Sequence, residues 1–205
     1  MTPADMVVLR FRGKRVPRAL VGLAVHDVAN PADVDPLVGA RRMIVLGVRA
    51  DVGIVLTRLL RADRLDVEVG LVRRPWHARR ARTAGARRVP LIRDETGAVV
   101  TEAAFWLPPD EDAQTITGEC VVDDISLFDG EATGVRIEPT ADPPGLRASV
   151  LTRSMRPGRW VTGRAAQLGT TAALVVRDGV AAPRPVRRST FYRHTQGWLA
   201  VDPAR

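Results

Sequence analysis

The chain has 205 residues, enough for one large domain or two small ones, and 45% of them are hydrophobic, which permits a full core. A formal net charge of +8 raises nucleic acids, anionic lipids and phosphorylated ligands as partners. Lys14 is the only lysine among the 31 basic residues. This dominance of arginine indicates the codon bias of a GC-rich genome of the actinobacterial kind, so part of the basicity is compositional.

Several features argue against a secreted or membrane-spanning protein. Cys120 is the only cysteine, so no internal disulfide can form. No apolar run approaches the roughly 20 residues that span a bilayer. The segment Met1–Val8 has no basic stretch before a long apolar run, so no signal peptide is expected. We therefore expect a cytoplasmic protein, with peripheral attachment to a membrane as an open alternative.

In chain order, Met6–Phe11 predicts an opening strand, and Met43–Val72 predicts the clearest unit of the first half. Met43–Val48 is a continuous apolar run, typical of a strand buried on both faces. Val67–Leu71 alternates and predicts a second strand. A helix is predicted between them from an apolar stripe at helical spacing, namely Val52, Val55, Leu56, Leu59 and Leu60. A crossover of this length joins two parallel strands with a right-handed connection.

The loop after the strand Met43–Val48 is the main candidate for a ligand site. Asp51 is predicted to be the N-cap of the helix, since its carboxylate can accept from the free amides of the first turn. Such a loop lies at the carboxyl edge of a parallel sheet, where a helix N-terminus favours an anion. We expect Gly47, Arg49, Asp51 and Gly53 to bind phosphate. The alternatives are plain helix capping by Asp51 and a solvent-facing Arg49.

Beyond residue 88 the sequence predicts β structure. Short alternating runs are separated by turn signals such as Asp129-Gly130 and Asp178-Gly179, which favour antiparallel hairpins. The predicted fold class is therefore α/β plus β. A small parallel-sheet half that resembles a nucleotide-binding domain, residues 1–88, is followed by an antiparallel β domain, residues 89–205.

Two basic clusters outside the loop are further candidates. Arg187, Arg188 and Arg193 flank hydroxyl side chains, and arginine forks beside hydroxyls suit phosphate oxygens. The alternative is an amphipathic strand with one polar face. Residues 73–88 contain Trp76 and many arginines, and they predict a basic helix that stacks on bases, lies on anionic lipid or is simply solvated.

The sequence resembles the diacylglycerol kinase, sphingosine kinase and NAD kinase superfamily in four segments. These are the loop Gly47–Asp51 after a buried strand, the helical Ile54–Leu59, the strand Arg88–Ile92 that would lead into the β domain, and the late hairpin Val175–Val180 with its Asp-Gly pair. The resemblance implies an ATP-binding fold and phosphoryl transfer from ATP to a hydroxyl. It also implies ATP and Mg²⁺ as cofactors, and a catalytic role for Asp51.

The loop departs from the Gly-Gly-Asp-Gly-Thr pattern of that superfamily, because Gly47-Val48-Arg49-Ala50-Asp51 keeps one glycine. We therefore expect a degenerate member that binds a nucleotide, another phosphorylated small molecule or a phosphorylated lipid. The second function class is a non-catalytic protein that binds nucleic acid or an anionic membrane surface. His26, His77 and His194 have no paired ligand spacing, so no structural metal is expected.

Overall fold

The computed structural model describes residues 5–110 and 112–201. Residues 1–4, the start of the segment considered for a signal peptide, lie outside the described residues, as do residues 202–205 of the expected second domain. The chain divides into two compact units, one of Met1–Val89 with Gln196–Arg205 and one of Pro90–Thr195. No helix in the described ranges has the length and hydrophobicity needed to cross a membrane.

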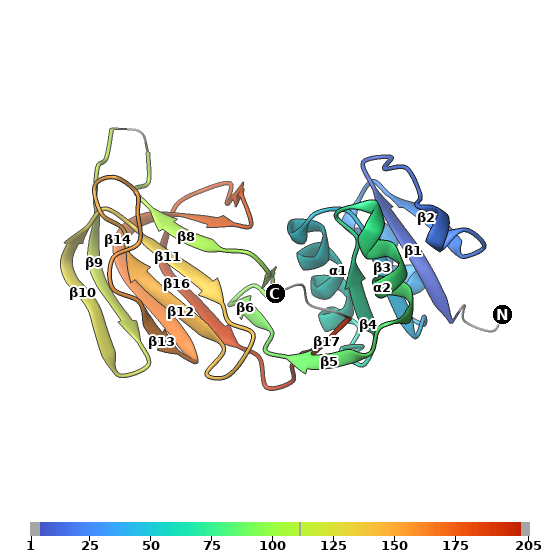
Figure 1. The fold of residues 1–205 in the computed structure, drawn as a ribbon. Helices are drawn as coiled ribbons and strands as arrows, with labels where there is room; N and C mark the ends of the chain where they lie inside the picture. The colour runs from blue at the N-terminus through green and yellow to red at the C-terminus, as the bar shows by residue number, and fades with distance from the viewer. Residues whose placement is uncertain (1–4, 111, 202–205) are drawn as a thin grey trace. The chain divides into compact units, whose positions relative to one another are not determined.

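The first unit is built on a six-stranded sheet with the order β2-β1-β3-β4-β17-β5 (Figure 1). Five neighbouring strands run parallel, and β5 pairs antiparallel with β17 at one edge. In sequence order the strands are β1 (Met6–Phe11), β2 (Ala24–Val28), β3 (Arg42–Leu46), β4 (Glu68–Leu71), β5 (Ala86–Val89) and β17 (Trp198–Val201).

In the described part of this unit, two α-helices and three short 3₁₀ helices connect the strands. They are η1 (Arg18–Leu20), η2 (Pro31–Leu37), α1 (Arg49–Arg61), η3 (Pro75–His77) and α2 (Ala78–Thr83). All five residues of β3 are buried, and α1 buries the predicted stripe from Val52 to Leu59. The register pairs Arg42 with Glu68, so β3, α1 and β4 form the predicted parallel crossover. The expected α/β half is confirmed.

The strand β17 returns to the first sheet after the whole second unit. It lies between β4 and β5, where Ala200 pairs with Val69 and Arg87 and is buried. The expected second domain, residues 89–205, differs from the observed second unit here. In this position Ala200 and Val201 are the buried residues of β17.

The second unit is entirely antiparallel in the pairing of its named strands. These are β6 (Ile92–Asp94), β7 (Val99–Val100), β8 (Ala104–Leu107), β9 (Ile116–Val122), β10 (Ile125–Ala132), β11 (Val135–Pro139), β12 (Leu146–Val150), β13 (Val161–Gly163), β14 (Ala165–Arg177), β15 (Val180–Ala181) and β16 (Val186–Arg193). This confirms the antiparallel half of the predicted fold class.

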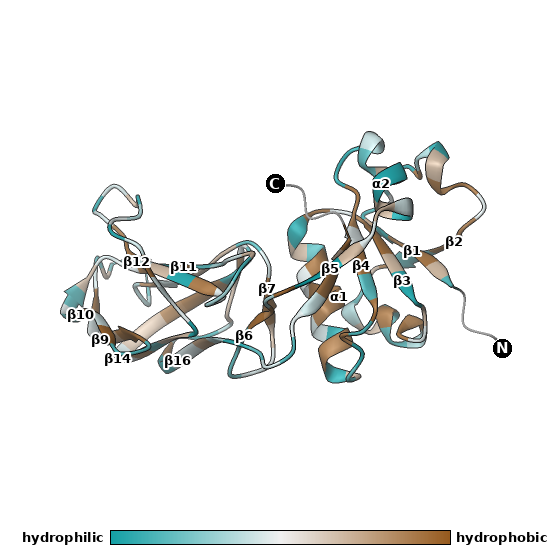
Figure 2. Ribbon diagram, turned by 60° about the horizontal axis from the view of Figure 1, so that its bottom comes forward, coloured by the Kyte–Doolittle hydropathy of each residue, from teal (hydrophilic) through white to brown (hydrophobic). Residues whose placement is uncertain are grey.

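The long strand β14 organises the second unit. Its first half pairs with β9 and β16, and its last four residues pair with β8. The core beneath it holds Trp106 and Phe191, whose ring centroids lie 5.6 Å apart, together with the fully buried Cys120. In Figure 2 the hydrophobic colour follows the central strands of each unit, as expected when strand interiors form the core.

Candidate functional site

The carboxyl edge of the first sheet contains a topological switch point between β1 and β3. β1 pairs with β2 on one side and with β3 on the other, so the chain crosses to the opposite side of β1 after β2. In open parallel sheets, ligands bind outside the strand ends at such a point. The segments that leave these two strand ends are residues 12–15 and residues 47–49.

Asp51 lies at the third position of α1, not at the N-cap as predicted. The N-cap is Val48, whose extended backbone (φ −119°, ψ 175°) lets the helix begin directly at Arg49. The Oδ2 atom of Asp51 accepts a hydrogen bond of 2.7 Å from the Val48 amide. An acidic residue at the third helical position satisfies the amide of the N-cap residue in this way. The connecting loop is therefore only Gly47 and Val48.

A second donor reaches the same oxygen of Asp51 from the end of β1. Arg12 Nη1 lies 2.7 Å from Asp51 Oδ2, and the side chains of Arg12 and Asp51 are 61% and 1% exposed. The other oxygen, Oδ1, is buried and has no hydrogen-bond partner among the described residues. Asp51 is thus a buried carboxylate that ties the loop to β1.

Gly47 provides the room that this carboxylate needs. A Cβ atom at position 47 would overlap Oδ2 of Asp51, so only glycine allows the side chain to fold back under the loop. The Gly47 carbonyl oxygen also accepts a 3.0 Å hydrogen bond from Nζ of Lys14. Two contacts therefore join the segments after β1 and β3, and both use a cationic side chain.

The other predicted members of the loop set occupy different positions along α1. Arg49 is exposed at the first helical position, beside the positive end of the helix. Gly53 is buried in the second turn, where its carbonyl oxygen accepts from Thr57 Oγ1 at 2.8 Å. Arg49 therefore lies at the N-terminus of α1, whereas Gly53 lies in its second turn.

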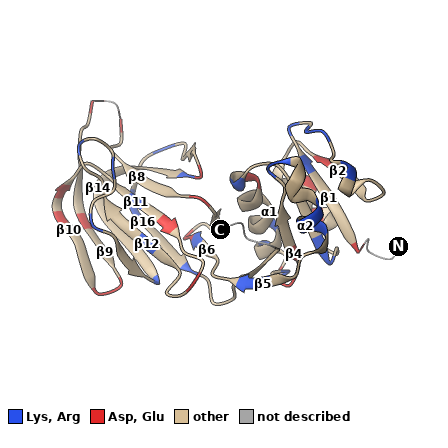
Figure 3. Cartoon of the chain, in the orientation of Figure 1, with Lys and Arg blue, Asp and Glu red and all other residues tan. Residues whose placement is uncertain are grey.

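The segment after β4 carries the basic and aromatic cluster expected from residues 73–88. Trp76 is 65% exposed, and the guanidinium of Arg74 lies 5.2 Å from the centre of its ring. His77 packs edge-on against the same indole, with ring centroids 5.9 Å apart. Figure 3 marks further basic residues along α2 and β5. The cluster is solvent-exposed and basic, and the Trp76 ring is its exposed aromatic surface.

Arg187, Arg188 and Arg193 lie in the second unit, on β16. Side chains alternate along a strand, and Ser189 and Phe191 are the buried residues of β16. Arg187 and Arg193 therefore lie on the same face of the strand as these buried residues, while Arg188 lies on the opposite face. Arg188 lines a cavity of about 320 Å³. These three residues do not form one convergent cluster.

The carboxylate of Asp51 does not fit the Mg²⁺ that the resemblance implies. Mg²⁺ takes exposed carboxylate oxygens together with phosphate and water. Here Oδ2 already accepts from Arg12 and Val48, and Oδ1 is buried. In the described part of the chain, no group of three or more His, Cys, Asp or Glu residues could hold a metal ion. We therefore assign Asp51 no metal-dependent step.

Sequence reasoning missed Arg12 and Lys14. Both follow the first strand directly, but their importance depends on β1 lying beside β3. Lys14 carries one signal that was available beforehand. It is the only lysine in a strongly arginine-rich chain, so compositional bias does not account for it.

Comparisons with known proteins identify the fold. No protein-family model and no curated protein matches the sequence. The structure of an NAD kinase from Archaeoglobus fulgidus in complex with ATP matches with a TM-score of 0.68 and 13% identity, covering 96% of this chain and 93% of that chain. A yeast NADH kinase complexed with NADH matches with a TM-score of 0.59 and 8% identity, covering 98% and 84%. The chain has the NAD kinase fold, as the resemblance predicts.

Proposed function

We propose that this protein binds a nucleotide, or another phosphorylated small molecule, at the switch point between β1 and β3. The observation that carries the proposal is the pair of contacts from Arg12 to Asp51 and from Lys14 to Gly47. These contacts hold the Arg12 and Lys14 side chains at the N-terminus of α1, a helix of 13 residues. Phosphate is the anion that such a combination of helix N-terminus and basic side chains favours.

The two cations keep donors for a ligand while they hold the loop. Arginine has five N–H donors and lysine has three, and each side chain uses one in the contacts above. The Arg12 side chain is 61% exposed. Arg49 adds a further positive charge at the first helical position. These three residues supply the charge neutralisation that a phosphate needs.

The fold likeness supports a nucleotide as the ligand. The archaeal NAD kinase structure contains ATP, and the yeast NADH kinase structure contains NADH. Of the predicted site residues, we assign Arg49 to phosphate binding and Gly47 and Asp51 to holding the loop in shape. Asp51 is a positioning residue in this proposal. We infer binding without phosphoryl transfer, because the carboxylate of Asp51, in the first turn of α1, is buried and paired with Arg12.

Thermal unfolding with ligands tests the proposal. ATP or ADP at about 100 times its Kd should raise Tm by roughly 5 °C or more, because it binds only the folded state. The rise should persist in EDTA, since the Asp51 carboxylate is engaged by Arg12 and Val48 and does not hold Mg²⁺ in this proposal. Lys14→Ala and Arg49→Ala should reduce it, whereas Arg61→Ala, an exposed arginine at the opposite end of α1, should not. No rise with any nucleotide would overturn the proposal, and a strict need for Mg²⁺ would overturn the role given to Asp51.

Trp76 favours a second candidate function, the binding of single-stranded nucleic acid. An indole that is 65% exposed beside Arg74 is suited to stacking on a base next to a phosphate contact. Trp76→Ala should weaken oligonucleotide binding by about 1–3 kcal/mol, and affinity should fall steeply with added salt. Salt-independent binding, or binding that Trp76→Ala leaves unchanged, would exclude this candidate.

A further inference from the structure

The second unit contains a cavity of about 560 Å³ near two of its edge strands. Its walls are the first residues of β10, residues 150–152 at the end of β12, and residues 158–162 that lead into β13. Among the described strands, β10 pairs only with β9, and β13 pairs only with β12. The volume falls within the range of small-molecule pockets, roughly 300–1,000 Å³.

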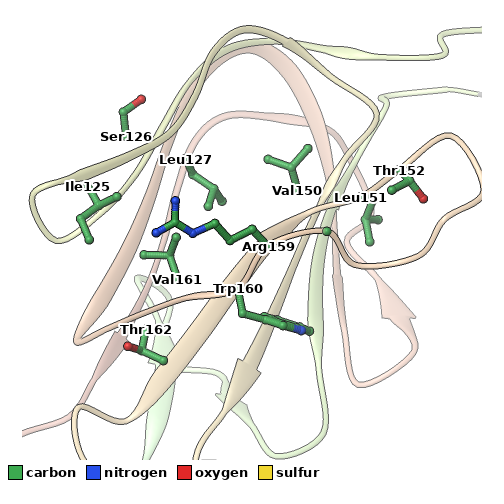
Figure 4. Close-up of a pocket in the computed structure, with 11 residues that line it drawn as sticks. Ile125, Ser126, Leu127, Val150, Leu151, Thr152, Arg159, Trp160, Val161 and Thr162 are labelled. Atoms are coloured by element: carbon green, nitrogen blue, oxygen red, sulfur yellow. The ribbon is translucent and has the colours of Figure 1, made fainter.

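Five of the described residues that line this cavity are aliphatic, and Ser126, Thr152, Thr162 and Arg159 add polar groups. Ile125, Leu127, Val150 and Val161 face it from the two sides, as Figure 4 shows. Ile125 is 54% exposed, which is unusual for a large aliphatic side chain that begins a strand. The cavity thus offers apolar surface to a ligand. Covering that surface would be favourable in free energy.

Arg159 is the one charged side chain of the lining. Its guanidinium extends toward Ile125 and Leu127 in Figure 4. It makes no ion pair with an acidic residue in the described ranges. An exposed arginine lying across apolar side chains leaves its planar fork open to an anion.

Two carboxylates of the second unit, those of Glu138 and Asp123, are engaged by other groups. The guanidinium of Arg147 lies 4.3 Å from the ring centroid of Trp160, and Arg147 also forms an ion pair with Glu138. The carboxylate of Asp123, at the turn before β10, accepts hydrogen bonds from the amides of Arg164 and Ala165. Glu138 and Asp123 therefore have other partners.

We propose that this cavity binds a free, monoanionic acyl-chain carboxylate, a molecule of the fatty-acid class. The chain lies against the aliphatic lining, and the carboxylate takes the fork of Arg159. A single guanidinium matches a single carboxylate in a bidentate pair. This site is separate from the proposed nucleotide site, because all of its residues belong to the second unit.

Calorimetric titration of the full chain with octanoate, decanoate and dodecanoate below their micelle concentrations tests the proposal. Affinity should rise about fourfold for each added methylene that the cavity covers. Decanol, which has the chain without the charge, should bind at least tenfold more weakly than decanoate. Affinity that does not depend on chain length, or equal affinity for decanol and decanoate, would overturn the proposal.

Matched variants locate the binding. Arg159→Ala should reduce decanoate affinity to that of decanol, whereas Arg153→Ala, an exposed arginine of the same loop outside the lining, should leave it unchanged. Ile125→Asp should weaken the whole series, and the exposure of this residue lets the variant fold. Unchanged decanoate binding by Arg159→Ala, or binding to phosphatidylcholine vesicles alone, would overturn the proposal. Because Arg159→Ala should keep its Tm rise with nucleotide, failure here is distinguishable from failure of the proposed function.

Discussion

Arg12 donates a hydrogen bond to Asp51 across 2.7 Å, linking the first residue after β1 to the third residue of α1. The two residues are 39 positions apart in the chain. The contact fixes the short loop between β3 and α1 against the neighbouring strand. It also places the Arg12 guanidinium at the N-terminus of α1, where the proposed function requires a positive charge.

The first prediction concerns this pair. Asp51→Ala removes the acceptor for the Val48 amide and should lower the free energy of unfolding by about 1 kcal/mol. Arg12→Ala should cost about 2 kcal/mol, because it leaves a carboxylate with 1% exposure short of a donor. Urea unfolding of both single variants and the double variant measures the coupling. The double variant should cost less than the sum, and strict additivity would show that the contact carries no energy.

Gly47→Ala is predicted to be destabilising because the new Cβ would overlap the Asp51 carboxylate. The expected cost is about 1–3 kcal/mol, typical of overpacking. In an Asp51→Ala background the same substitution should cost much less, since the overlapping group is gone. Gly85→Ala is the matched control, because a Cβ there meets nothing within 4 Å. An equal cost of Gly47→Ala in both backgrounds would contradict this explanation.

Two neighbouring arginines should differ sharply in their contribution to stability. Arg42 is 6% exposed, pairs with Glu68 at 2.5 Å, and donates to the carbonyl oxygens of Ala81, Arg82 and Ala84 at the end of α2. Arg42→Met should cost about 3–5 kcal/mol, since it leaves three carbonyl oxygens without their donor and Glu68 with only the weaker contact from Arg41. The exposed Arg41 also pairs with Glu68, yet Arg41→Met should cost less than about 1 kcal/mol. Equal melting temperatures of the two variants would refute this ranking.

The Cys120 thiol should be inert in the folded protein. Burial, and then the nearby charge of Glu119, raises its pKa from 9.0 to about 12. The folded state therefore holds the proton more tightly than the unfolded state. Stability should be independent of this group below pH 9 and should fall by up to about 1.4 kcal/mol per pH unit between pH 9 and 12.

Cys120→Ala removes this pH dependence and is the control. Alkylation of the wild-type thiol at pH 8 should proceed only as fast as the second unit unfolds, because the side chain is fully buried. Rapid alkylation without denaturant would mean that β9 opens locally.

The sequence predicted the unit from β3 to β4 because its signals are local and strong. The apolar run of β3 and the stripe of α1 each identify one element without reference to the rest of the chain. The start of α1 was misplaced for the same reason. Aspartate is favoured both at the N-cap and in the first turn, so Asp51 alone does not fix the boundary.

The missed features all depend on distant pairing. Arg12 and Lys14 matter because β1 lies beside β3, and local pattern gives no information about that neighbour. Arg187, Arg188 and Arg193 are close in sequence, yet strand alternation separates Arg188 from the other two. β17 was expected as a strand, but its sheet partners β4 and β5 lie more than 100 residues earlier.

The position of β17 has a consequence for biosynthesis. The second unit is continuous in sequence and can fold as soon as residues 90–195 have emerged from the ribosome. Among the described strands β5 pairs only with β17, so the first sheet ends at β4 until Trp198–Val201 have been translated. The amino-terminal unit is thus begun first and completed last, and during that interval its exposed strand edges are where a chaperone would be needed.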